Sequence, residues 1–194
     1  MGTSIEDGTG SRKGAMVGDK NRLHTHALAA SASSVATVTG DAFNVSSELI
    51  TLTSDSDSGL LYISNGEQEA ISVTTLFVNF GTSANGVGKG LVSFYLDPTG
   101  GTLITEANEA QVLNRKVGAP ETLTADTYKG AEAKTITGGN LIQLPSSGGP
   151  IASEYVLSKG ACFALSVTPP PGNTSMQVQI GFLVIKKYNS YTID

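Results

Sequence analysis

From residue 41 onward, the apolar residues come in short runs separated by clusters of glycine, proline, serine, asparagine and aspartate. Runs of this length, bounded by turn residues, are typical of strands and their connections. No convincing long stretch follows the 3.6-residue period of an amphipathic helix. We therefore expect an all-β fold, a β-sandwich or jelly-roll-like single domain. The clearest expected strands are 49–53, 60–63, 70–80, 91–96, 155–157, 162–167 and 176–188.

Two of these runs alternate in a way that assigns their faces. In the run 70–80, one face is expected to carry Ile71, Val73, Thr75 and Phe77, and the other Leu76, Val78 and Phe80. Because both faces are apolar, we expect a central strand. In the last run, one face is expected to carry Met176, Val178, Ile180, Phe182 and Val184, opposite Gln177, Gln179 and Gly181.

The stretch from Thr102 to Gly149 gives a weaker signal. Residues 103–104 read as the end of a strand, and residues 106–113 as one or two turns of helix. Residues 135–142 read as a hairpin around Gly138-Gly139.

The first 40 residues contain few large apolar side chains and are rich in glycine, serine and charge. We expect residues 1–40 to form an extended N-terminal arm, and residues 41–194 to form the β-sandwich domain. The small residues 27–38 suit a short helix or an extended linker, and the β-branched residues at the end of this stretch favour the extended form.

Charge and hydropathy exclude some classes of partner. Residues 41–110 carry nine acids and one base, Lys89, which argues against a nucleic-acid surface. No segment is long and apolar enough to span a membrane, and the first 20 residues lack the apolar core of a secretory signal. We therefore expect a protein made in a cytoplasm, with neither nucleic acid nor membrane as partner. The single cysteine, Cys162, lies in an apolar run and is expected to be a buried, inert thiol.

Three motifs resemble chemical sites, and none satisfies its pattern. His24 and His26 are spaced to face one metal ion, but no third ligand lies nearby, so we interpret them as surface residues of the arm. The glycine-rich segment 81–90 has Ser83 and Gly90 where a phosphate-binding loop needs Gly and Ser or Thr. We interpret that segment as a hairpin loop.

The third motif is the run Asp55–Gly59, which begins like a calcium loop. It lacks the carboxylate or amide at its fifth position and the Glu at its twelfth, so we interpret it as a turn. We assign no catalytic, cofactor-binding or metal-binding residue, expect no cofactor, and do not expect an enzyme.

Several strings in order along the chain resemble a known group of proteins. They are Lys20-Asn21-Arg22-Leu23-His24-Thr25, Gly40-Asp41-Ala42-Phe43-Asn44-Val45, Leu123-Thr124-Ala125-Asp126-Thr127-Tyr128-Lys129-Gly130-Ala131-Glu132 and Pro170-Pro171-Gly172-Asn173-Thr174-Ser175-Met176. Together they span about Lys20 to Ile185. The chain resembles virion structural proteins of tailed bacteriophages, including head decoration (cement) proteins.

The resemblance implies a β-sandwich subunit on the capsid exterior of the virion, with the major capsid protein and sister subunits in a homotrimer as partners. In this setting the arm is the expected partner-binding element, because its cations can pair with acidic neighbours and its backbone can add to a sheet edge. The arm residues expected to bind are Arg12, Lys13, Lys20, Arg22, Leu23 and His24. Two alternatives stay open: a tail, collar or fibre-associated structural protein, and a receptor- or glycan-binding module that uses the loops around residues 79–90.

Overall fold

The computed structural model of the protein describes residues 4–6, 14–16, 31–81, 90–106, 108–146 and 149–186. The chain divides into two compact units, Met1–Ser31 and Ala32–Asp194. In the first unit, β1 (Ser4–Glu6) and β2 (Gly14–Met16) pair antiparallel. All other described elements belong to the second unit.

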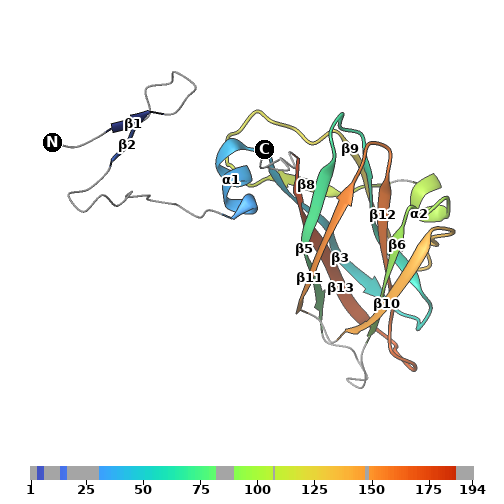
Figure 1. Ribbon diagram of the computed structural model, residues 1–194. Coiled ribbons are helices and arrows are strands. Elements are labelled where there is room, and N and C mark those ends of the chain that lie inside the picture. The colour runs from blue at the N-terminus through green and yellow to red at the C-terminus, as the bar shows by residue number, and fades with distance from the viewer. Residues whose placement is uncertain are drawn as a thin grey trace. The chain divides into compact units, whose positions relative to one another are not determined.

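The second unit is built from two antiparallel sheets (Figure 1). The five-stranded sheet has the order β11 (Gly149–Leu157), β5 (Ile71–Phe80), β13 (Met176–Ile185), β3 (Ala42–Leu52) and β8 (Gln111–Asn114). The six-stranded sheet has the order β10 (Asn140–Ser146), β6 (Gly90–Leu96), β12 (Cys162–Thr168), β4 (Ser58–Asn65), β9 (Ala125–Lys129) and β7 (Asn108–Glu109). The predicted all-β sandwich is confirmed.

The strand pairing is nested from the ends of the domain inward. The first long strand, β3, pairs with the last, β13, and the next two pairs are β4 with β12 and β5 with β11. The innermost pair is β6 with β10. This nesting, with the partners distributed over two sheets, is a jelly roll. The chain between β6 and β10 adds three strands: β7 and β8 are edge strands, and β9 lies between β4 and β7.

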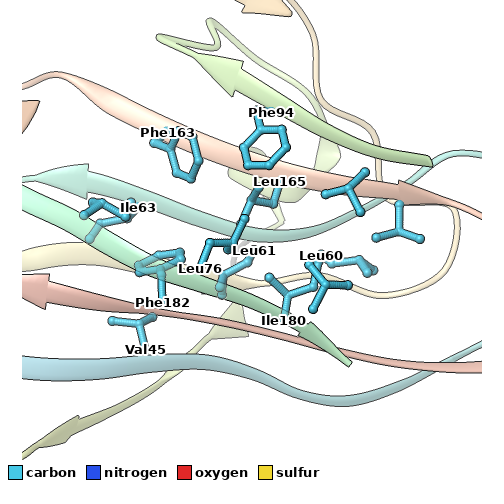
Figure 2. Close-up of a cluster of buried hydrophobic side chains, with 14 of the residues drawn as sticks. Val45, Leu60, Leu61, Ile63, Leu76, Phe94, Phe163, Leu165, Ile180 and Phe182 are labelled. Carbon is cyan, nitrogen blue, oxygen red and sulfur yellow. The ribbon is translucent and has the colours of Figure 1, made fainter. Parts of the chain in front are cut away.

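The core lies between the sheets and is formed by the inward face of each strand. In β13 the buried residues Met176, Val178, Ile180, Phe182 and Val184 all belong to it, as the alternation predicts. Large side chains from both sheets meet there (Figure 2). Three of the four buried phenylalanines lie close together: the ring centroid of Phe163 lies 6.1 Å from that of Phe94 and 6.3 Å from that of Phe182.

The predicted faces of β5 are wrong beyond its midpoint. The strand does lie between two neighbours, β11 and β13, as expected. However, Thr75 has a φ of 49°, and the register with β13 shifts there because β5 contains an extra residue. This β-bulge puts Leu76 and Val78 on the core side with Ile71 and Val73, where strict alternation would have placed them opposite.

The helix α1 (Ala32–Thr39) replaces the extended structure favoured for this part of the chain. The hydroxyls of Thr37 and Thr39 donate hydrogen bonds to the carbonyls of Ser33 and Ala36 in the same helix. Threonine usually weakens a helix, but here both hydroxyl groups have hydrogen-bond partners within it. Gly40 ends the helix with a φ of 92°. Ala36 is buried against Ala42, Leu183 and Ile185 on the outer face of the five-stranded sheet. This packing stabilises the helix over the extended form.

Four further expectations are corrected. Residues 103–104 lie in the short helix α2 (Thr102–Thr105), and the expected helical turns at 106–113 are instead the strands β7 and β8. Residues 135–142 are not a hairpin: Thr137 makes an isolated bridge to Gly100, and β10 begins at Asn140. The strands on either side of residues 81–90, β5 and β6, lie in different sheets, so this segment does not join a hairpin.

Candidate partner-binding flank

The predicted arm residues Arg12, Lys13, Lys20, Arg22, Leu23 and His24 lie outside the described residues, as do His26 and residues 82–89. Within the part of the chain that the structure describes, no three His, Cys, Asp or Glu side chains gather in a way that could hold a metal ion. In the same part, no helix is long and apolar enough to cross a membrane.

Residues 55–57 of the run Asp55–Gly59 lie in the connection from β3 to β4, as the predicted turn requires, whereas Ser58 and Gly59 are the first residues of β4. Asp57 has a structural use there: its carboxylate accepts hydrogen bonds from the hydroxyls of Ser166 at 2.7 Å and Thr168 at 2.9 Å. The Tyr95 hydroxyl donates to its other oxygen at 3.4 Å. These bonds fasten the turn to the outer face of the six-stranded sheet.

Cys162 is half-buried at the start of β12, which makes it more accessible than the sequence predicts. Its thiol donates to the carbonyl of Pro98 at 3.4 Å. Burial raises the pKa of the Cys162 thiol, and a raised pKa means less of the reactive thiolate.

Helix α2 covers part of the outer face of the six-stranded sheet. Tyr62, Ala164 and Tyr95 stand opposite one another in successive strands of that face. Leu103 of α2, which is 1% exposed, packs in this cluster with Tyr62 and Ala164. The small alanine between two tyrosines leaves the space that Leu103 fills, so this region is a second, minor core and not a free surface.

The edge of the sandwich formed by β7 and β8, here called the β7–β8 flank, is closed by the chain itself. β7 ends the six-stranded sheet, β8 ends the five-stranded sheet, and Ala110 crosses between them. The Ala110 N–H donates to the Thr127 carbonyl at 3.0 Å, and Ala110 and Val112 pack against the core. The Lys129 ammonium of β9 pairs with the Glu48 carboxylate of β3 across the two sheets.

The opposite edge, here called the β10–β11 flank, has a different character. In the described part of the chain, β10 pairs with β6 alone and β11 with β5 alone. Ile142 stands opposite Phe94 and Leu144 opposite Val92, both buried in the core. Directly opposed residues share a face of the sheet, so Ile142 and Leu144 also point inward. Both are nevertheless 41% exposed.

β11 supplies the other side of this flank. Tyr155 and Ile151 are partly buried and pack against the core. The Tyr155 ring lies 5.0 Å from that of Phe163 and 6.4 Å from that of Phe94, centroid to centroid. Tyr155 thus covers the core residues Phe94 and Phe163 at this flank. The side chains of β10 that point toward the core, Ile142 and Leu144, remain accessible to solvent.

The β10–β11 flank is a long edge that is only partly protected: β10 is uncharged but contains Pro145, and β11 contains Pro150, the exposed Glu154 and a register shift between Ile151 and Glu154. Natural sheet edges are usually shortened, charged or covered, because free backbone groups pair with other strands. β10 and β11 are seven and nine residues long, and residues 140–146 contain no charged side chain. The arrangement can bind an extended strand along β10 and apolar side chains beside it.

Sequence reasoning missed this flank because it treated residues 135–142 as a hairpin. Two signals were available in residues 140–146: the absence of charge, and Pro145, which is confined to edge strands because it cannot donate to a ladder. Comparisons of the chain with protein-family models, with curated proteins and with solved structures found no match. The fold and the two flanks therefore stand on the chain's own geometry.

Proposed function

We propose that this chain is a structural, non-enzymatic protein of a tailed-bacteriophage particle, and that it binds the outside of the head as a decoration (cement) protein. The resemblance of its sequence strings to phage virion proteins supports the proposal. So does the jelly roll, an architecture used in viral capsid domains.

The observation that carries the proposal is the β10–β11 flank. A shell-binding subunit needs a rigid body and at least one surface that adds to a neighbour without electrostatic repulsion. The nested sheets supply the body, and the uncharged, apolar edge at Leu141, Ile142 and Leu144 supplies such a surface.

The partners that fit this role are the major capsid protein and sister subunits in a homotrimer. The basic residues of the first unit, Arg12, Lys13, Lys20 and Arg22, fit an acidic neighbour. Neither nucleic acid nor membrane is proposed as a partner, and the location is the capsid exterior of the virion.

The test is the protein composition of purified particles of the phage that encodes the chain, followed by an averaged image of the particle. The proposal expects hundreds of copies per particle and density on the outside of the head. A few to tens of copies, with density on the tail or collar, would replace it with the tail, collar or fibre alternative. Absence from washed particles would contradict both, and specific binding on a glycan array would favour a receptor-binding module.

A truncation separates the two units in the same assay. Residues 1–31 form their own unit, whereas α1 packs on β3 and β13, so the cut belongs at Ser31 and not within the helix. We expect the chain lacking residues 1–31 to stay folded by circular dichroism and to lose co-sedimentation with particles stripped of the protein. Undiminished co-sedimentation would assign shell binding to the jelly roll alone.

A further inference from the structure

We propose that the outer face of the five-stranded sheet binds a neutral, β-linked saccharide, whose apolar ring face stacks on Phe77 and whose hydroxyls bond to Gln179 and Asn79. The site, here called the Phe77 strip, consists of two neighbouring rows across three strands: Phe77, Gly181 and Ser46, then Asn79, Gln179 and Leu49. The inference goes beyond the function proposed above, because a subunit at any place on the particle can carry such a site.

The strand register places the strip on the outer face of its sheet. Phe77 of β5 stands opposite Gly181 of β13, and Gly181 stands opposite Ser46 of β3. The neighbours of Gly181 in the chain, Ile180 and Phe182, are buried in the core, so Gly181 and the residues paired with it point away from the core. The backbone at Phe77 and Gly181 has a paired strand on each side. A ligand therefore meets side chains here and not a free sheet edge.

Two β-bulges turn large apolar side chains of the strip outward. In β5, the extra residue at Thr75 moves Phe77 off the core side, on which strict alternation from the start of the strand would place it. In β3, the register with β13 shifts at Glu48, whose φ is 62°, and this puts Leu49 on the outer face. Bulges that re-aim a side chain are frequent next to active sites, and a β-branched residue such as Thr75 adopts a positive φ only with strain. Strain on both sides of one row indicates that the outward direction of these side chains has a use.

Gly181 lets the Phe77 ring lie over the sheet. A Cβ at Gly181 would collide with the far end of the Phe77 ring, so the ring occupies the space above the glycine. Phe77 is nevertheless only partly buried. The face of an aromatic ring is electron-rich, and the C–H groups on the apolar side of a sugar ring carry partial positive charge, so the two stack.

The row beside the ring supplies hydrogen-bonding groups. Gln179 stands between Asn79 and Leu49 in the register. The Gln179 amide donates to the Ser46 hydroxyl at 3.3 Å, which holds this side chain along the outer face. Asn79 is exposed, and Leu49 is 61% exposed. A side-chain amide donates and accepts at once, as the hydroxyls of a sugar do.

The charges around the strip select a neutral ligand. The strip itself contains no charged residue. Of the carboxylates nearest to it, that of Glu48 is paired with Lys129, and that of Glu154 accepts a hydrogen bond from Ser72 at 2.9 Å. A phosphate chain or an acidic sugar needs cations, which the strip lacks.

The balance of apolar and polar groups selects a saccharide among neutral ligands. One ring and one leucine among amides and a hydroxyl make a smaller apolar area than the centre of a protein interface contains. They match a molecule with one apolar face and a rim of hydroxyls. In β-linked glucose and N-acetylglucosamine the ring substituents are equatorial, so these sugars present flat apolar faces.

The experiment is a titration of the full chain with two probes, cellotetraose and N-acetylated chitotetraose, followed by NMR of the backbone and side-chain amides. At least one probe is expected to bind saturably and to shift the signals of Phe77, Asn79 and Gln179. Phe77→Leu keeps apolar bulk over the glycine but removes the aromatic face, and is expected to weaken binding about tenfold or more. Gly181→Ala keeps the ring but displaces it, and is expected to weaken binding similarly.

Gln143→Ala is the matched control for Gln179→Ala. Each glutamine lies on the outer face of a sheet and donates to a serine hydroxyl of the neighbouring strand, Gln143 to Ser93 at 3.1 Å. Gln179→Ala is expected to weaken binding about threefold or more, because it removes hydrogen bonds to the ligand. Gln143→Ala is expected to leave binding unchanged.

Three outcomes would overturn the proposal: no saturable binding of either probe, binding by a folded Phe77→Leu variant equal to that of the parent, and equal weakening by Gln143→Ala and Gln179→Ala. Loss of particle binding by Phe77→Leu, with no binding of either probe to the parent, would overturn it in favour of a protein contact. The copy number per particle tests the function proposed above, so the two proposals fail separately.

Discussion

At the β7–β8 flank, the edge strands are two and four residues long, and a Lys129–Glu48 ion pair joins the two sheets. At the β10–β11 flank, the edge strands are seven and nine residues long, and inward-facing Ile142 and Leu144 remain accessible. Both flanks border the same core, but they differ in the length of the sheet edge that they leave without a neighbouring strand. Short edges leave little backbone for another strand to pair with, whereas long edges leave more, and of the two long strands β10 is uncharged while β11 carries Glu154. This contrast makes the β10–β11 flank the better candidate for partner binding under the function proposed above.

The largest expected effect concerns the close strand contact near the β7–β8 flank. Gly130 follows β9, and its N–H donates to the Leu60 carbonyl at 2.9 Å. A Cβ at Gly130 would collide with the backbone carbonyl of Gly59, so neither strand can yield cheaply. We expect Gly130→Ala to lower the free energy of unfolding by roughly 3 kcal/mol or more, measured by urea denaturation.

Gly149, at the start of β11, is the matched control on the other flank. A Cβ there would meet no atom within 4 Å, but φ is 107°, which an L-residue adopts only with strain. We expect Gly149→Ala to cost about 1–2 kcal/mol. Equal losses for the two glycines would contradict the tighter closure of the β7–β8 flank.

The second effect concerns the aromatic ring that closes the β10–β11 flank from inside. Tyr155 contacts Phe94 and Phe163 and is partly buried. We expect Tyr155→Ala to cost about 2–3 kcal/mol in the free energy of unfolding and to increase binding of a hydrophobic dye. Tyr155→Phe keeps the ring and should stay within about 0.5 kcal/mol of the parent. A negligible effect of the alanine variant would show that this flank is open to its interior.

The third effect is a pH dependence in the outer-face row of tyrosines. Tyr62 stacks on Tyr128 of β9, with ring centroids 5.5 Å apart, and burial raises the pKa of Tyr62 to about 12. An unfolded tyrosine ionises near pH 10. Because the folded state holds the neutral form, its contribution is complete below about pH 10 and is lost as the pH rises toward about 12.

Tyr62→Phe should therefore lose less stability than the parent as the pH rises from about 10 to about 12. The measurement is the denaturation midpoint as a function of pH. Tyr95, at the other end of the same row, also has a raised pKa, from burial first and from Asp57 second. Tyr95→Phe should give a smaller effect than Tyr62→Phe. A larger effect of Tyr95→Phe than of Tyr62→Phe would mean that Tyr95 is more deeply buried than Tyr62.

The smallest effect concerns the ion pair between the sheets. The side chains of Lys129 and Glu48 are 35% and 50% exposed, so water and salt screen their attraction. We expect Glu48→Gln to change the free energy of unfolding by no more than about 0.5 kcal/mol, with the difference shrinking in high salt. A loss well above this would make the ion pair, and not Ala110 and Val112, the main closure of the flank.

The sequence predicts the elements whose pattern is purely local. β13 alternates because one face is buried along its whole length, and the prediction was confirmed residue by residue. In β5 the same reasoning was wrong after Thr75, because a bulge depends on the register with β13 and leaves no mark in the alternation. Likewise, α1 forms because Ala36 packs on Leu183 and Ile185, residues about 150 positions away in the chain.

The candidate flank could be predicted only in part: the absence of charge and Pro145 in residues 140–146 suit an edge strand, but the exposure of its apolar side chains depends on the fold. Ile142 and Leu144 look like ordinary strand residues in the sequence, and what distinguishes them is position at the end of a sheet order. That order follows from long-range pairing of β6 with β10 and β12, which no local pattern encodes. The expectations for the arm, the trimer and the capsid partner remain predictions.

Hydrogen exchange of the full chain, free and bound to particles, tests the central contrast most directly. Among residues 140–146, the amides that face away from β6 should exchange fast in the free protein and become protected on the particle, because they acquire a partner. Amides of residues 108–114, whose flank is already closed, should exchange at the same rate in both states. Protection that rises at 108–114 and not at 140–146 would contradict the account.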